Sequence, residues 1–210
     1  TYESKAAFCG PATGVFGVSI IDDRSGDDTY RSSEQFCIGA GLFGFGILID
    51  RAGNDHYHNL GPAAGWSRGG GFYGAGIVLD LAGSDEYLGE KLCQGVGGPR
   101  GFGAIVDGTP AVWLGMCLRV GFGVRGYSAG VVGSIYDLGG DDRYEAGEFS
   151  QAGAYYFGLG VMHDYGGNDA YFGNRYGQAF AAHQAAGILV DDAGDDAYWS
   201  MTAASPFEPR

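Results

Sequence analysis

The chain has 210 residues, of which 42 are glycine, and its 25 acidic residues against 12 basic ones leave a net charge of -13. So much glycine, spread along the whole chain, excludes a mainly helical protein, because glycine costs about 1 kcal/mol per helix-interior position. Six prolines and no Gly-X-Y period exclude collagen, and a 45% hydrophobic content argues against disorder. The negative charge argues against nucleic acid or an anionic membrane as partner and favours cations.

From its first residues the chain repeats the pattern D-x-x-G-x-D-x-Y, as in Asp23, Gly26, Asp28 and Tyr30. We call the two aspartates of each copy the leading and the second Asp. Six complete copies supply the following aspartates: Asp23, Asp28, Asp50, Asp55, Asp80, Asp85, Asp137, Asp142, Asp164, Asp169, Asp191 and Asp196. A degenerate seventh copy begins at Asp107, and counting along the sequence places Val112 in its second Asp position and Leu114 in its tyrosine position.

Each copy predicts short strands. A glycine precedes the leading Asp by four positions in six copies, and an apolar trio such as Ile47-Leu48-Ile49 follows it, which is typical of a β-strand. We expect a second strand through the tyrosine and a third through the stretch that holds Gln94, Gln151 and Gln178. Glycines would let the chain turn between these strands.

Three short strands per 27 to 30 residues predict an all-β chain folded as a parallel β-solenoid, or β-helix, of about seven rungs. We expect one solenoid domain over residues 1–200, with residues 201–210 as a C-terminal tail or cap. Thr1 and Tyr2 match the end of a repeat, so the chain is expected to begin within one and to be a fragment of a longer array.

The repeated aspartates account for the charge, since without the thirteen motif carboxylates the net charge would be zero. Stacked rungs would place like charges about 5 Å apart, which costs about 3 kcal/mol per pair at an effective dielectric constant of 20. Calcium, with its six to eight oxygen ligands, could compensate for this repulsion, and the twelve aspartates of the complete copies are the predicted ligands. Asp and Gly also form turns without any metal, so both interpretations stay open.

The segment Ala52-Gly53-Asn54-Asp55-His56-Tyr57 resembles the glycine- and aspartate-rich repeats of RTX (repeats-in-toxin) β-rolls. That resemblance implies calcium bound between turns, although RTX repeats recur every nine residues. The whole chain more closely resembles uncharacterised bacterial proteins, largely predicted to be exported, that repeat G-x-G-x-L-x-D-x-x-G-x-D-x-Y. This resemblance implies an extracellular, periplasmic or cell-surface location and no particular activity.

Several motifs have a competing explanation within the repeat. Gly126-Tyr127-Ser128-Ala129-Gly130 matches a hydrolase nucleophile elbow, but no helix is expected after it. The dinucleotide-like glycines, Gly39 to Gly44 and Gly69 to Gly74, recur in successive rungs and also open no helix.

Two residue pairs raise the question of a site. His56 and His58 would share one face of a strand, where they are either a zinc pair or ordinary surface residues. Cys9 and Cys37 would be rung neighbours, either as buried thiols or as a bridge.

The tyrosines are expected to form a stacked ladder, with an exposed sugar-binding strip as the alternative, and the glutamines an amide ladder. Because catalysis needs a unique constellation and the polar residues here are replicated, we expect a non-catalytic scaffold or interaction subunit. Its partners would be other protein subunits or neighbouring repeats of the same protein, covering the apolar outer face. The alternative is a polysaccharide-binding or polysaccharide-degrading β-helix with a site at the irregular fourth rung, near Trp113, Arg119 and Arg125.

Overall fold

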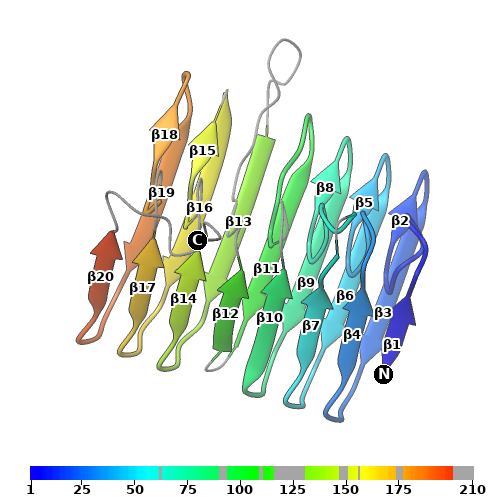
Figure 1. Ribbon diagram of the computed structural model, residues 1–210, viewed down its shortest axis with the longest axis horizontal. Helices are drawn as coiled ribbons and strands as arrows, with labels where there is room; N and C mark the ends of the chain where they lie inside the picture. Colours follow the sequence, from blue (N-terminus) through cyan, green and yellow to red (C-terminus); the bar gives the residue numbers. More distant parts are fainter. Residues whose placement is uncertain are drawn as a thin grey trace, which may run out of the picture.

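The computed structural model is all-β, and its strands run parallel to one another along the whole stack (Figure 1). It describes residues 1–61, 63–89, 94–108, 111–115, 131–146, 151–155, 157–173 and 177–200. Among these residues every strand pairing is parallel, and no helix is long and apolar enough to cross a membrane.

One layer is an eight-stranded sheet, here called the tyrosine sheet because the motif tyrosines lie on it. Its strands, in spatial order, are β1 (Tyr2–Ser4), β4 (Thr29–Ser32), β7 (His56–Asn59), β10 (Asp85–Gly89), β12 (Ala111–Gly115), β14 (Arg143–Ala146), β17 (Ala170–Gly173) and β20 (Ala197–Ser200).

The second layer is a seven-stranded sheet, here called the aspartate sheet because each strand ends at a leading Asp. Its strands are β3 (Val18–Asp23), β6 (Phe45–Asp50), β9 (Ala75–Asp80), β11 (Phe102–Asp107), β13 (Val131–Asp137), β16 (Gly158–Asp164) and β19 (Ala186–Asp191).

A third side is built from two-residue strands. Three of them form one sheet, namely β2 (Gly14–Val15), β5 (Gly41–Leu42) and β8 (Gly71–Phe72), and two form another, namely β15 (Ala154–Tyr155) and β18 (Ala181–Ala182). The predicted parallel β-solenoid is confirmed, because each strand pairs with its equivalent in the next repeat. Asp50 lies opposite Asp80, for example, and Tyr144 opposite Tyr171.

The core consists of side chains that point inward from the two large sheets. On the aspartate sheet these are the middle residues of the apolar trios, such as Leu48 and Val78, and both are fully buried. The glycine four positions before the leading Asp also faces inward, and a Cβ at Gly76 would overlap the carbonyl oxygen of Gly70. Glycine is therefore required there because the third side packs directly against the sheet backbone.

The degenerate rung differs from the sequence prediction by one residue. Trp113, and not Leu114, lies in register with Tyr87 and Tyr144, and Ala111 lies opposite Asp85 where Val112 was expected. Asp107 and Ala111 are four positions apart, whereas Asp80 and Asp85 are five positions apart, and this difference shifts the register.

The glutamine stretch is also not a strand. Gln151 and Gln178 lie in bends with φ values of 47° and 55°, and the short strands β15 and β18 begin three residues later. Each glutamine donates its amide Nε2 to main-chain carbonyls of the tyrosine sheet: Gln151 to Tyr144 and Phe172, both at 3.1 Å. These bonds to the backbone replace the predicted amide ladder and tie two adjacent strands together.

Glycine makes only some of the corners. One corner, seven residues before the leading Asp, holds non-glycine residues with φ near 50°, among them Phe16, Phe43, Tyr73 and Phe157. The left-handed conformation costs such residues about 1 kcal/mol or more. Their side chains point to solvent, and Phe16 stacks on Phe43 and Phe43 on Tyr73 with ring centroids 5.0 Å apart in both pairs.

Candidate metal centre

The D-x-x-G-x-D-x-Y turn connects an aspartate-sheet strand to the following tyrosine-sheet strand. The leading Asp is the last residue of the first strand and points into the solenoid, as Asp50 and Asp80 do with no exposed surface. The second Asp, such as Asp55, lies at the entrance to the next strand and is also buried. The two carboxylate columns therefore lie inside the stack and not on its surface.

A glycine is needed between the two aspartates because successive turns are stacked tightly. A Cβ at Gly83 would overlap the carbonyl oxygen of Gly53, and a Cβ at Gly167 would overlap that of Gly140. The close approach of these turns brings the aspartates of neighbouring rungs together.

The leading aspartates accept hydrogen bonds from the tyrosine hydroxyls. The Tyr144 hydroxyl lies 2.7 Å from Asp137 Oδ2 and 2.8 Å from Asp164 Oδ2, so it stands between two successive leading aspartates. Tyr171 stands in the same way between Asp164, at 3.0 Å, and Asp191, at 3.1 Å. Hydroxyls and carboxylates thus alternate along the stack, which separates the like charges.

The tyrosine rings that carry these hydroxyls form the predicted stacked ladder. Tyr57 and Tyr87 have ring centroids 4.7 Å apart at 6°, and Tyr144 and Tyr171 have the same separation at 11°. All four are fully buried, which excludes the alternative of an exposed sugar-binding strip at these positions.

The second aspartates accept hydrogen bonds from the backbone of the preceding rung. Asp55 Oδ1 accepts from the N–H of Asp28 at 2.6 Å, Asp85 Oδ1 from Asp55 at 2.7 Å, and Asp169 Oδ1 from Asp142 at 2.7 Å. This is turn chemistry that requires no metal, but it uses only one oxygen of each carboxylate.

The other oxygens are left without donors. Within the described residues, the buried atoms Asp55 Oδ2, Asp85 Oδ2 and Asp80 Oδ1 have no hydrogen-bond partner, and the same holds for Asp169 Oδ2 and Asp191 Oδ1. Unpaired buried oxygens of this kind cost free energy, and a cation or a proton between them would remove the cost.

Three groups of aspartates bring one carboxylate oxygen from each member to within 4.8 Å of the others, and each group spans two adjacent rungs: Asp55, Asp80 and Asp85; Asp137, Asp142 and Asp164; and Asp169, Asp191 and Asp196. The structure therefore brings together nine of the twelve predicted ligands. Asp23, Asp28 and Asp50 belong to no such group among the described residues.

Burial shifts the acidity of these carboxyls. Desolvation, with the repulsion of Asp85 next, raises the pKa of Asp80 to about 8, and desolvation raises the pKa of Asp55 and Asp169 to about 7 and that of Asp85 to about 6. Asp23 differs because it is only partly buried, and hydrogen bonds, first from the Tyr2 hydroxyl, lower its pKa. Buried carboxyls with a raised pKa take up a cation or a proton near neutral pH, whereas Asp23 has no such need.

The other residues that the sequence singled out do not belong to the aspartate turns. Cys9 is exposed and Cys37 buried, and both are free thiols. The glycines of the dinucleotide-like motifs lie on bends and on the short strands β5 and β8 and open no helix. Arg119, Arg125, Ser128 and the tail 201–210 lie outside the described residues.

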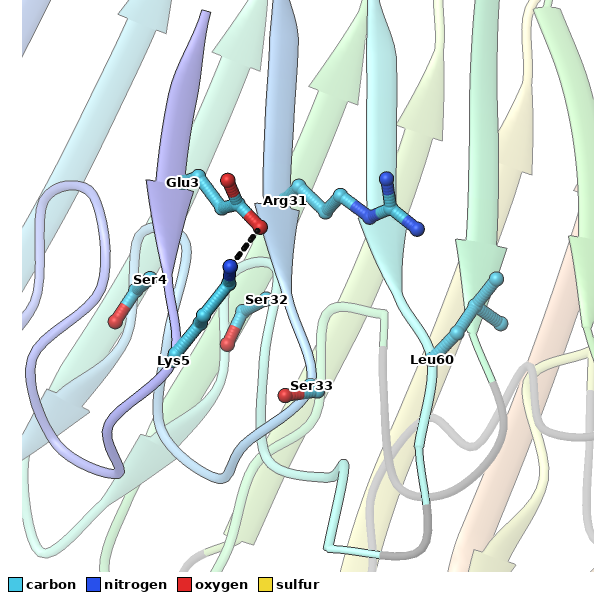
Figure 2. Close-up of a pocket in the computed structure, with 7 residues that line it drawn as sticks. All are labelled: Glu3, Ser4, Lys5, Arg31, Ser32, Ser33 and Leu60. Atoms are coloured by element: carbon cyan, nitrogen blue, oxygen red, sulfur yellow. Dashed lines mark ion pairs between the residues drawn. The ribbon is translucent and has the colours of Figure 1, made fainter.

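A pocket of about 450 Å³ lies at the ends of β1, β4 and β7 (Figure 2). Lys5 and Arg31 give it positive charge, but Lys5 is 3.5 Å from the Glu3 carboxylate, and hydroxyls of Ser32 and Ser33 complete much of the lining. It is separate from the aspartate turns.

Sequence reasoning missed two structural features of the interior. The spacing of seven residues between the leading Asp and the tyrosine could have indicated that the hydroxyl reaches the carboxylate. The second feature is Arg68, whose buried position no sequence pattern indicated. It is fully buried, and its Nη1 donates to the carbonyls of Tyr57 and Leu88, the role that glutamine has in other rungs.

Comparisons of this chain with protein-family models, with curated proteins and with solved structures find no match.

Proposed function

We propose that the protein is a non-catalytic scaffold or interaction subunit whose rungs are stabilised by cations, with calcium as the ion. The observation that carries this proposal is the set of unpartnered buried carboxylate oxygens on aspartates that come within 4.8 Å of one another across adjacent rungs. Oxygen-only ligand groups suit a hard cation, and calcium tolerates irregular geometry better than magnesium does.

The uniformity of the interior supports a scaffold. The tyrosines, the leading aspartates and the second aspartates recur at equivalent positions, so their polar chemistry serves the stacking of rungs. Extracellular calcium modules bind the ion with dissociation constants of about 10⁻⁴ to 10⁻³ M, which fits the exported location that the sequence resemblance implies.

The outer face of the aspartate sheet is the proposed contact surface for another protein subunit or for neighbouring repeats of the same protein. Apolar side chains dominate it, and Val18, Ile20 and Phe45 are more than half exposed. With Phe16 and Phe43 at the adjoining corner they form a contiguous apolar area of a kind that marks interaction sites.

Carbohydrate binding is a second candidate, favoured by the exposed row Phe16, Phe43 and Tyr73. Flat aromatic rings at a regular spacing can stack on sugar rings. Affinity electrophoresis in gels that contain polysaccharides tests it, and the Phe43→Ala variant should lose any retardation that the unchanged chain shows.

Calcium binding is tested by thermal unfolding after dialysis against a chelator, with and without added calcium. At about 100 times its dissociation constant a ligand contributes about 2.7 kcal/mol, so we expect the melting temperature to rise by roughly 5–10 °C.

The increment should shrink in Asp80→Asn, which replaces a carboxyl ligand of one buried group by a neutral amide, and should persist in Asp192→Asn, which changes an exposed carboxylate. An identical melting temperature in chelator and in calcium would rule out a cation-stabilised stack.

A further inference from the structure

The outer face of the tyrosine sheet carries a cluster that no other described rung repeats. His56 and His58 lie on β7 on either side of the buried Tyr57, so both point outward. Glu86, on the neighbouring strand β10, lies directly opposite His56 in the register. At the equivalent positions β4 has Thr29 and Arg31, and β17 has Ala170 and Phe172.

Both histidines contact the same carboxylate. His58 Nε2 is 3.1 Å from Glu86 Oε2, and His56 Nε2 is 3.6 Å from the same oxygen. Two ligand atoms on a tetrahedral zinc ion lie about 3.3 Å apart, given zinc-ligand distances near 2.05 Å. Both nitrogen–oxygen distances are close to that value, whereas the three residues do not yet bring one ligand atom each to within 4.8 Å of the others.

The two imidazoles are not yet in the arrangement of a filled site. Their ring centroids lie 5.6 Å apart at 80°, so the rings would have to turn toward each other to share an ion. The His56 side chain is 48% exposed, and its position at the start of β7 leaves room for this rotation.

We propose that His56, His58 and Glu86 form a binding site for a divalent transition metal of the zinc class. Imidazole nitrogens favour zinc and similar ions over calcium, whereas the interior aspartate groups offer oxygen alone. The site and the proposed calcium groups therefore differ in ion preference, and one can be filled without the other.

Three protein ligands leave one position of a tetrahedral ion for water or another small ligand. All three side chains are partly exposed, at 48%, 21% and 32%, so solvent has access to that position. Arg31 lies opposite His58 on β4 and is exposed, and its positive charge moderates the affinity for a cation.

The competing explanation is a pair of ordinary surface contacts between histidine and a carboxylate, a kind of contact that the chain also has elsewhere. His163 lies 3.0 Å from Asp192 in the next rung of the aspartate sheet, with a single histidine and a single carboxylate. This pair provides a matched control, because it has the same contact without the second imidazole.

The experiment is calorimetric titration of the chain with zinc in saturating calcium, followed by visible spectroscopy with cobalt as the probe. We expect one zinc per chain and the intense visible absorption of tetrahedral cobalt. His58→Gln should weaken zinc binding at least about 10-fold, and so should Glu86→Gln, while His163→Gln should leave it unchanged.

Circular dichroism of each variant checks that the fold is retained, which is expected because these side chains lie outside the core. The proposal is overturned if the unchanged chain binds no stoichiometric zinc, if His58→Gln binds it equally well, or if calcium competes for it. Calcium-dependent stability would be unaffected by any of these results, so the two metal proposals fail separately.

Discussion

The inner and outer faces of the tyrosine sheet have the same backbone but opposite sequence patterns. On the inner face, the position two residues after the second Asp repeats as Tyr30, Tyr57, Tyr144 and Tyr171, all fully buried. On the outer face, the residue that follows this tyrosine is Arg31, His58, Glu145 or Phe172. In-register stacking places every inner side chain beside the equivalent side chain of the next rung. The inner residues must therefore be of a type that can stack on itself.

The two faces differ in what their polar residues do: those on the inner face stabilise the stack, and those on the outer face can differ from rung to rung. A buried carboxylate in this fold can be satisfied by the tyrosines of its own and the preceding rung or by the backbone of the preceding rung, so its recurrence from repeat to repeat indicates stacking. An outer residue is free to vary, and a cluster that the other described rungs do not repeat, such as His56, His58 and Glu86, is where a distinct binding property can arise.

The largest effect is expected inside the turn. In Gly167→Ala the added Cβ would overlap the Gly140 carbonyl oxygen, so adjacent turns would have to separate. We expect a loss of about 3 kcal/mol or more in the free energy of unfolding, measured by urea denaturation. Gly17→Ala is the control, because the nearest atom to its added Cβ is 3.7 Å away, and a similar loss there would contradict this explanation.

The next effect concerns the hydroxyl between the aspartates. Tyr144→Phe keeps the stacked ring but leaves Asp137 and Asp164 without that donor, which should cost about 2 kcal/mol. Tyr165→Phe, on an exposed ring, should change the free energy of unfolding by less than about 0.5 kcal/mol. Equal effects of the two substitutions would show that the inner hydroxyls contribute nothing special.

The pH dependence follows from the raised pKa values of Asp55, Asp80, Asp85 and Asp169, which lie at about 6 to 8 in the folded chain and near 3.9 when unfolded. The folded chain then binds more protons than the unfolded chain between these values, so stability falls as pH rises through them. In chelator, we expect the melting temperature to drop by several degrees between pH 5 and pH 8.

Calcium should flatten this dependence, because a bound cation takes the place of the proton. Thermal unfolding over the pH series, with and without calcium, measures both curves. A melting temperature that rises with pH in chelator would mean that the buried carboxyls are ionised and satisfied without either ligand.

The smallest effect is expected on the outer face. His56→Ala and His58→Ala should each change the metal-free stability by less than about 0.5 kcal/mol, because partly exposed ion pairs contribute little. Urea denaturation in chelator checks this. A loss above about 1 kcal/mol would show that the outer face also stabilises the stack.

The solenoid could be predicted from the sequence because the repeat fixes which residues become neighbours. The leading aspartates lie in register as the spacing indicates, from Asp23 beside Asp50 to Asp164 beside Asp191. The prediction was wrong where the spacing changes: a turn shortened by one residue places Trp113 and not Leu114 beside Tyr87. Counting from the leading Asp cannot detect such a change when the next tyrosine is missing.

The candidate metal centre could be predicted only in part. The pattern identified the carboxylates, but it gave neither their burial nor the tyrosine and backbone donors that satisfy many of their oxygens. Glu86 was not linked to His56 and His58, because contacts across strands depend on the register and on which face each residue occupies. The register and the face of each residue are given only by the three-dimensional structure.

The regular register also means that the interior residues do not determine how many rungs the stack contains. The inner surfaces of the rungs that end at Asp137, Asp164 and Asp191 match one another at a spacing of 27 residues, so these rungs are interchangeable in the stack. Excision or duplication of one such unit would move the outer features of the two ends closer together or further apart by about 4.8 Å while the interior stays the same. The number of rungs between two outer clusters therefore sets the distance between them.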